Sequence, residues 1–345
     1  MRLIPINEVR VGSELAIDIL DENFRKLLPK THKLSNINLQ RLRTTNIASV
    51  YITDKYCTLE NNYGRYTNES ANMIDKILKI KKAIFNSAMG INTNESVALG
   101  LKTIHQIIQE LDAQKDNLKI AYEPQKISIE DFGEQMVYIA IMSGLFALKL
   151  GFNKAEATVI CLGAILKDIA VMSPAFKGTV SHSSKLHPVK GYQYLKTKYN
   201  FPESVLQIVL QHHELYDGKG YPRNLKGDEI CAGARIIAII EMFYKLKTTN
   251  LNQGGKALQA DITKGLSYYD PNYFAEFKKH VTIFDPDMLV LLTNGDIATV
   301  TSAHAENPFK PQVKIIKSMT YGRGVNLNLS EVDNLEIYRV IYYID

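Results

Sequence analysis

Cysteine is scarce in this sequence, and no two of its cysteines are spaced like a pair. The chain of 345 residues has three of them, Cys57, Cys161 and Cys231. Cys161 and Cys231 lie in apolar sequence, which is typical of thiols in a protein core. This usage does not suit a disulfide framework, and we expect a protein of the reducing cytoplasm.

Long apolar runs are missing as well. The longest uncharged stretch covers residues 136–148, and it is shorter than the roughly 20 residues that a membrane-spanning helix needs. We expect this stretch to form a buried helix. Residues 1–5 lead directly into mixed polar sequence and do not resemble a secretory signal. The sequence therefore predicts no transmembrane segment.

A strong excess of one charge is also absent. The 41 basic and 36 acidic residues give a net charge of +5, which tolerates an anionic ligand but does not indicate a nucleic-acid partner. Four lysines between residues 76 and 82 lie on a helix-like stretch, and we expect them to form a solvated face. The composition, 46% hydrophobic and 22% charged, is typical of a globular protein of about two domains.

Pattern changes along the chain predict four parts. Residues 1–57 contain short β-like runs around a helical segment, which favours a small α/β cap. Residues 58–120 begin with a polar, Asn-rich linker and continue with connecting helices. Residues 121–280 have the pattern of a helical domain, and residues 281–345 alternate apolar runs with turn residues, as a small β module does. We therefore expect a mainly α protein.

Several individual elements can be assigned from periodicity. The linker is expected over residues 58–72, and Asn94 and Ser96 are candidate helix start signals. The expected helices cover residues 36–45, 73–88 and 94–115, and the expected strands cover residues 14–18, 48–53, 288–292, 296–301 and 313–317.

The most informative stretch is residues 212–222, which reads His-His-Glu-Leu-Tyr-Asp-Gly-Lys-Gly-Tyr-Pro. His212 and His213 end an apolar helical run and can offer imidazole nitrogens to a first-row transition metal. The loop that follows, Asp217–Pro222, requires positive φ or a close backbone approach at Gly218 and Gly220. Pro222 then ends the loop rigidly, so a metal-type pair of residues stands beside a shaped loop.

Residues 120–280 resemble the HD-GYP family, metal-dependent phosphodiesterases of the HD superfamily that hydrolyse cyclic di-GMP. Besides the loop that contains Tyr221, the resemblance rests on three segments, 187–191, 225–230 and 234–243. It implies an HD-superfamily helical bundle as the core of the protein. It also implies that His187, in the first of these segments, is a metal ligand.

The first departure from the family pattern is at the start of the expected site. Family members have an adjacent His-Asp pair followed by Ile-Gly-Lys, whereas residues 167–171 read Lys-Asp-Ile-Ala-Val. Lys167 therefore replaces the histidine of the pair, and Val171 replaces the trailing lysine. Gln135 stands where the family has a further histidine ligand on the preceding helix.

Further departures follow the loop. Glu241 corresponds to the aspartate ligand of the family. Asn250 falls near the position of the phosphate-binding arginine, and Gln253 falls at a neighbouring basic position. The resemblance therefore implies that the phosphate contacts of the family are weakened in this chain.

The remaining donors suit one metal position better than two. Asp168, His187, His212 and His213 form a ligand set for one Fe, Mn, Zn or Ni ion, and Glu241 is a further candidate. The second position would depend on a neutral amide and on Lys167. A protonated lysine does not coordinate a metal. We therefore expect at most one transition metal, or none.

Lys167 has two interpretations. It is either a lysine that snorkels from a helix end, or a positive charge that replaces the lost ion and pairs with Asp168 or Glu241. Both interpretations remove the second metal. No catalytic set is then intact, and Lys167 and Asp168 are its remnant. His182, by contrast, is expected to be a surface loop residue.

Three functions compete. We favour a catalytically impaired HD-GYP-type protein of cyclic di-GMP signalling that acts as a regulatory or docking module. Its GYP loop (Asp217–Pro222) would contact a signalling protein through Tyr221 as an exposed aromatic anchor. The first alternative is an active metal-dependent phosphodiesterase with an unusual metal site. The second is a sensor that binds cyclic di-GMP without cutting it, which Asn250 and Gln253 make less favourable.

Overall fold

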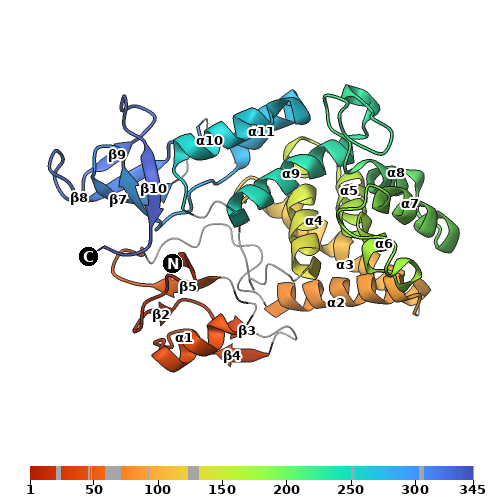
Figure 1. Cartoon of the computed structure of the whole chain (residues 1–345), viewed down its shortest axis with the longest axis horizontal. Helices are drawn as coiled ribbons and strands as arrows, with labels where there is room; N and C mark the ends of the chain where they lie inside the picture. Colours follow the sequence, from red (N-terminus) through yellow and green to blue (C-terminus); the bar gives the residue numbers. More distant parts are fainter. Residues whose placement is uncertain are drawn as a thin grey trace.

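The computed structural model describes residues 1–20, 25–45, 47, 49–58, 71–91, 93–122, 132–249, 252–302 and 307–344. The protein is mainly α-helical, as predicted, with a small sheet region near each end of the chain (Figure 1). The helices are α1 (Asn36–Arg43), α2 (Ala71–Met89), α3 (Thr93–Gln114), α4 (Phe132–Lys149), α5 (Lys154–Leu166), α6 (Ile169–Met172), α7 (His187–Lys198), α8 (Glu203–Gln211), α9 (Ala232–Thr249), α10 (Gly255–Lys264) and α11 (Pro271–His280), with short 3-10 turns η1 (Pro174–Phe176), η2 (Gly227–Glu229) and η3 (Leu266–Tyr268).

Helix α4 lies at the centre of the helical domain and packs against α5 and α9. Every residue from 136 to 148 is buried, which confirms the predicted buried helix. Gly151, with φ of +88°, ends the turn after α4, and a capping box between Asn153 and Glu156 starts α5. Among the described residues, no helix is long and apolar enough to cross a membrane.

The N-terminal unit, residues 1–58, contains strands on both sides of α1. Strands β1 (Arg2–Pro5), β5 (Ser49–Thr53) and β2 (Glu14–Leu15) form an antiparallel sheet in the order β1-β5-β2. Strands β3 (Ile19–Leu20) and β4 (Lys26–Leu28) form a separate pair. Ser35 caps α1 through a reciprocal bond with Asn38. The predicted helix and the predicted strand at 48–53 are confirmed here.

The C-terminal sheet is antiparallel and has the order β10-β6-β7-β8-β9. Its strands are β6 (Leu289–Leu292), β7 (Ile297–Ser302), β8 (Gln312–Lys317), β9 (Asn326–Asn328) and β10 (Ile337–Ile341). The strands expected at 288–292, 296–301 and 313–317 are therefore confirmed. Gly295, with φ of +87°, turns the chain between β6 and β7. Buried residues of this sheet share one hydrophobic core with the helical domain.

Three expectations for the segment before the helical domain need comment. Lys76 is buried and pairs with Glu110, so the expectation of a solvated face is wrong for this lysine, although Lys79 and Lys82 are exposed. Asn94 lies within α3 and not before it. Most of the expected linker lies outside the described residues, and its last two residues belong to α2.

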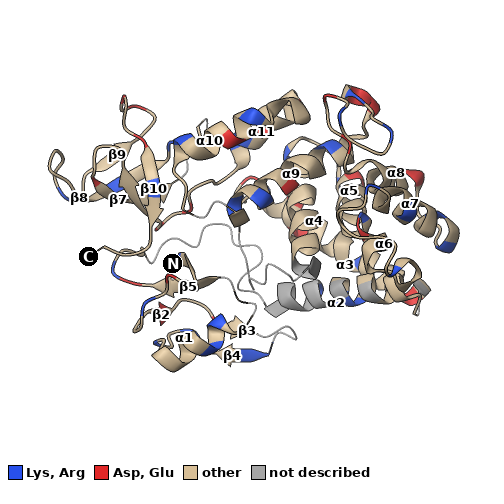
Figure 2. Cartoon of the chain, in the orientation of Figure 1, with Lys and Arg blue, Asp and Glu red and all other residues tan. Residues whose placement is uncertain are grey.

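Figure 2 shows charges of both signs spread over the N-terminal, helical and C-terminal parts.

Candidate functional site

The buried ion pair at the end of α5 is the first part of the site. Lys167 ends the helix and Asp168 follows it, with 4% and 2% of their surfaces exposed. The ammonium of Lys167 pairs with Oδ2 of Asp168 and lies 2.6 Å from Oε1 of Glu241, which projects from α9. One ammonium therefore holds two carboxylates together. This is the pairing that the charge-substitute interpretation of Lys167 predicts, and it includes both carboxylates.

The electrostatics of this group favour its charged form. Burial alone would lower the pKa of Lys167, but the negative charges of Asp168 and Glu241 and the hydrogen bonds to both raise it above its ordinary value. Burial likewise opposes ionisation of Asp168, yet the positive charge of Lys167 and its hydrogen bond hold the pKa of that carboxyl well below its usual range. The three side chains thus carry one positive and two negative charges.

Three histidines converge beside this ion pair. His187 begins α7, His212 ends α8, and His213 follows it, so the chain brings two distant segments together. One ring nitrogen from each lies within 4.8 Å of the others. His187 and His212 are buried, and His213 is half-buried. The histidine segment and the His-His pair that sequence reasoning selected are therefore neighbours in space.

Backbone contacts fix the tautomers of two of these rings. Nδ1 of His187 lies 2.7 Å from the carbonyl of Ser184, and Nδ1 of His212 lies 2.8 Å from the carbonyl of Val209. A carbonyl oxygen only accepts hydrogen bonds, so each Nδ1 must carry the proton and donate it. Burial and the neighbouring His212 also lower the pKa of His187, which favours a neutral ring. A neutral imidazole that is protonated at Nδ1 has its lone pair on Nε2.

These lone pairs point at one place. Nε2 of His187 and Nε2 of His212 are 3.0 Å apart, and Oδ1 of Asp168 lies 3.4 Å and 3.7 Å from them. Two unprotonated nitrogens and a carboxylate oxygen repel each other unless a cation lies among them. Imidazole and carboxylate are donors for Zn, Fe, Mn or Ni, and backbone carbonyls that orient ligating histidines are common around such metals. These residues therefore fit one transition-metal ion.

His213 is enclosed on its outer side by the GYP loop. The ring of Tyr221 stacks on it with a centroid distance of 4.8 Å and an interplanar angle of 25°, and Lys185 lies 5.7 Å from the Tyr221 ring centre. Burial, followed by the proximity of the His212 and His187 rings, lowers the pKa of His213 to about 2. Tyr221 is half-buried. The expectation of an exposed aromatic anchor is therefore wrong, because this ring forms part of the wall of the site.

The GYP loop needs both of its glycines, for different reasons. Gly218 has φ of +84°. At Gly220, a Cβ atom would lie 2.2 Å from the amide nitrogen of Leu215, which no side chain tolerates. Asp217 accepts a hydrogen bond from the amide of Lys219 at 3.1 Å and so shapes the loop locally. The sequence prediction of positive φ or close approach is met at both glycines.

Glu214 was missed by sequence reasoning. It is buried and accepts hydrogen bonds from the amides of Arg223 at 2.7 Å and Leu225 at 3.0 Å. Its carboxylate therefore holds the end of the GYP loop beside the histidines. The sequence did contain a signal for this role. Glu214 directly follows the His-His pair and precedes a glycine-rich loop, and the backbone amides of such a loop need hydrogen-bond acceptors.

The remaining candidates lie elsewhere. Gln135 is half-buried in the first turns of α4, and Asn250 lies outside the described residues. Gln253 forms an isolated β-bridge with Arg339 of β10, so it contacts the C-terminal sheet. His182 is exposed, as expected. Partial desolvation of its ring by the surrounding protein lowers its pKa, while the charge of Asp168 opposes that shift.

Comparison with known families agrees with this geometry. Residues 178–273 match the family model of the HD domain, and residues 289–342 match that of a KOW domain associated with the HD domain. The chain thus contains a match to the HD domain, and the resemblance to the HD-GYP family stated from the sequence is supported by this match. The HD match begins after Lys167 and Asp168, where the sequence departs from the family.

Two curated relatives are cyclic di-GMP phosphodiesterases. The response regulator RpfG of Xanthomonas campestris is 36% identical over 125 residues, which cover 33% of this chain and 32% of RpfG. A second enzyme, from Pseudomonas aeruginosa, is 29% identical over 135 residues, which cover 38% of this chain and 33% of that enzyme. The chain therefore spans about a third of the length of these relatives.

A solved structure of Bd1817, described as an HDG"Y"P protein from Bdellovibrio bacteriovorus, is similar to 80% of this chain and 97% of its own. Its sequence identity is 16% and the TM-score is 0.47.

Proposed function

We propose that this protein is a catalytically impaired HD-GYP-type protein of cyclic di-GMP signalling, and that it acts in the cytoplasm as a regulatory or docking module. The observation that supports this best is the position of Lys167, whose ammonium lies between the carboxylates of Asp168 and Glu241. A cation that belongs to the chain then occupies the place between two carboxylates that a second metal would need.

Phosphodiester hydrolysis with two metals depends on ions about 3.5–4 Å apart that stabilise both the attacking and the leaving oxygen. Lys167 can neutralise charge, but a protonated amine cannot make a bound water acidic. The histidine and aspartate set can hold only the other ion. Turnover of cyclic di-GMP is therefore expected to be very slow or absent.

The proposal keeps one metal. Asp168, His187, His212 and His213 would hold it, and Glu241 is less available because it pairs with Lys167. Such an ion supplies a Lewis acid when bound. The ion pair and neutral histidines carry a net charge of about −1, which favours binding of a divalent cation over an empty site.

Cyclic di-GMP remains a candidate ligand because two relatives act on it. The non-hydrolysing sensor gains little support, since Gln253 contacts the C-terminal sheet and supplies no basic phosphate contact. The alternative of an active phosphodiesterase would require hydrolysis with one metal ion next to the buried Lys167.

The docking part of the proposal rests on the GYP loop, which Glu214 and two glycines hold in one shape. Tyr221 stacks on His213 and is therefore not free to contact a partner. A signalling protein would instead contact exposed side chains in and next to the GYP loop, such as Lys219 and Arg223. Arg223→Ala should weaken binding to a partner isolated with the wild-type protein and leave the melting temperature unchanged. Equal binding by the variant removes the docking role.

The catalytic part is tested with a cyclic di-GMP hydrolysis assay under added Mn²⁺, Fe²⁺ or Zn²⁺. We expect no product above that formed by Asp168→Ala, because both proteins lack a two-metal centre. Metal-dependent turnover by the wild type that Asp168→Ala abolishes would restore the enzyme alternative.

A further inference from the structure

The N-terminal unit has a hydrophobic core of its own. Its buried residues, among them Ile4, Leu15, Val50 and Ile52, form a cluster separate from the large one that joins the helical domain and the C-terminal sheet. Among the described residues, Tyr342 is a partly buried side chain that packs against both clusters. The N-terminal unit can therefore keep its own fold without burying its core against the rest of the chain.

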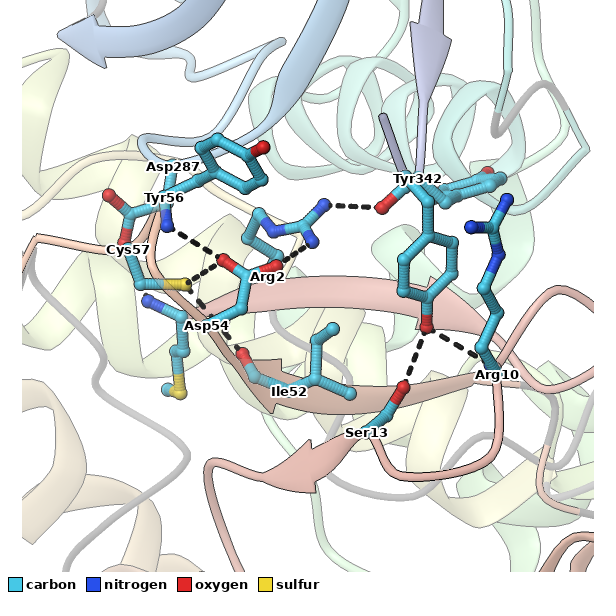
Figure 3. A network of polar contacts seen from close by, with 11 residues as sticks. Arg2, Arg10, Ser13, Ile52, Asp54, Tyr56, Cys57, Asp287 and Tyr342 are labelled. Atoms are coloured by element: carbon cyan, nitrogen blue, oxygen red, sulfur yellow. Dashed lines mark hydrogen bonds and ion pairs between the residues drawn. The ribbon is translucent and has the colours of Figure 1, made fainter. Parts of the chain in front are cut away.

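Besides the packing of Tyr342 and Tyr343 on its core, this unit makes polar contacts with the C-terminal segment. The guanidinium of Arg2 donates to the carbonyl of Tyr342 at 2.8 Å, and within the N-terminal unit it also pairs with Asp54 (Figure 3). The hydroxyl of Tyr343 lies 2.8 Å from Oγ of Ser13 and accepts from the amide of Arg10 at 3.1 Å. We call this set of contacts the polar joint.

A second polar contact lies beside the joint. Asp287, just before β6, accepts hydrogen bonds from the amide of Thr58 at 3.0 Å and from its hydroxyl at 3.1 Å. Asp287 is buried and has φ of +70°. The connection between the N-terminal unit and the C-terminal sheet thus combines a few hydrogen bonds and ion pairs with the packing of Leu3, Tyr342 and Tyr343.

Packing at the joint is incomplete. A cavity of about 30 Å³ is lined by all three parts of the chain, mostly by apolar side chains such as Leu3 of the N-terminal unit, Leu246 of α9 and Met288 of the C-terminal part, together with Ser49, Lys247 and Gln253. Nε of Arg2 and Oε1 of Gln253 are buried there without a hydrogen-bond partner among the described residues. Unsatisfied buried polar atoms and voids both weaken an interface.

The joint also reaches the helix that carries Glu241. Lys247 lies near the end of α9 and donates to the carbonyl of Ile283 at 2.6 Å. Gln253 follows α9 and bridges to Arg339 of β10. Glu241 and Lys247 are separated by less than two turns of one helix, about 9 Å along its axis. A movement at the joint therefore acts on the end of the element that positions Glu241.

We propose that the N-terminal unit is a separately folded module that docks reversibly through the polar joint, and that its release frees the end of α9 and the facing edge of the C-terminal sheet. The separate cores allow the module to leave intact. The cavity and the two unsatisfied atoms lower the stability of the docked state. This proposal does not depend on whether the candidate site binds a metal or hydrolyses a nucleotide.

Hydrogen–deuterium exchange on the full chain tests the proposal. Arg2→Ala removes the side chain that contacts both Tyr342 and Asp54. We expect peptides covering residues 246–249, 252–258 and 284–292 to exchange about tenfold faster, which corresponds to about 1.4 kcal/mol. Peptides covering α5 should keep their wild-type protection, because the core of the helical domain remains folded.

Tyr343→Phe is a second, milder variant, since it removes only the hydroxyl that contacts Ser13 and Arg10. It should change the same peptides in the same direction by a smaller factor. Arg41→Ala, on the exposed side of α1, is the matched control and should change nothing. Unchanged exchange in Tyr343→Phe and Arg2→Ala contradicts the proposal. So does a rise in Tyr343→Phe that includes β5, because the unit would then not fold separately; Arg2→Ala cannot serve for this part, since it also removes the pair with Asp54 beside β5.

Discussion

Nζ of Lys167 lies 2.6 Å from Oε1 of Glu241 while it also pairs with Asp168, so a single ammonium joins the end of α5 to the middle of α9. Side-chain exposure is 5% for the lysine, 3% for Asp168 and 23% for Glu241. An ion group this buried depends on all of its members. Removal of the cation would leave two carboxylates next to each other in a poorly solvated place.

Lys167→Ala should therefore destabilise the protein strongly. Loss of one partner from a buried ion pair costs about 3–5 kcal/mol, and urea unfolding in the presence of a chelator measures this loss. Lys219→Ala is the control, because Lys219 also pairs with an aspartate, Asp217, but is exposed. If both variants unfold at the wild-type midpoint, Lys167 does not have the structural role assigned to it.

His187 and His212 should both be neutral Nδ1–H tautomers in the metal-free protein. The carbonyls of Ser184 and Val209 require a donor at each Nδ1, and the lowered pKa of His187 favours the neutral ring. Long-range ¹H–¹⁵N correlation spectra distinguish the two tautomers, and His187→Gln and His212→Gln assign the signals. A proton on Nε2 of either ring would remove the shared acceptor position.

Gly220→Ala should damage the GYP loop. The new Cβ atom would lie 2.2 Å from the amide nitrogen of Leu215 and 2.5 Å from the carbonyl oxygen of His213. Forced overpacking of this kind costs about 1–3 kcal/mol and should shift His213 and Tyr221. Thermal unfolding measures the loss. Gly322→Ala is the control, since its Cβ atom would meet only a side-chain carbon of Val325 at 3.6 Å, and equal melting temperatures would contradict the prediction.

Local patterns predicted much of the fold. The uncharged run at 136–148 became the buried helix α4, and the strands expected at 288–292 and 296–301 are β6 and β7, which pair with each other. Periodicity reports on one element at a time, so it identified the strands near each end but not their partners. The boundaries of the four predicted parts remain predictions.

The candidate site was predicted in part. Sequence reasoning selected the His-His pair, His187, Asp168 and Glu241, and allowed a pair between Lys167 and a carboxylate. It could not predict that Tyr221 stacks on His213, because that contact depends on how the loop folds back on α8. Nor could it place Gln253 against β10, since the bridge to Arg339 joins segments far apart in the sequence.

The number of metal ions per chain tests the central claim most directly. Inductively coupled plasma mass spectrometry of protein purified from its native cells should find at most one transition metal per chain. Any metal found should be lost in His212→Ala and kept in the control His182→Ala, because His212 belongs to the converging histidines and His182 is exposed. Two tightly bound ions per chain would contradict the account, because Lys167 would then not stand in for the second metal.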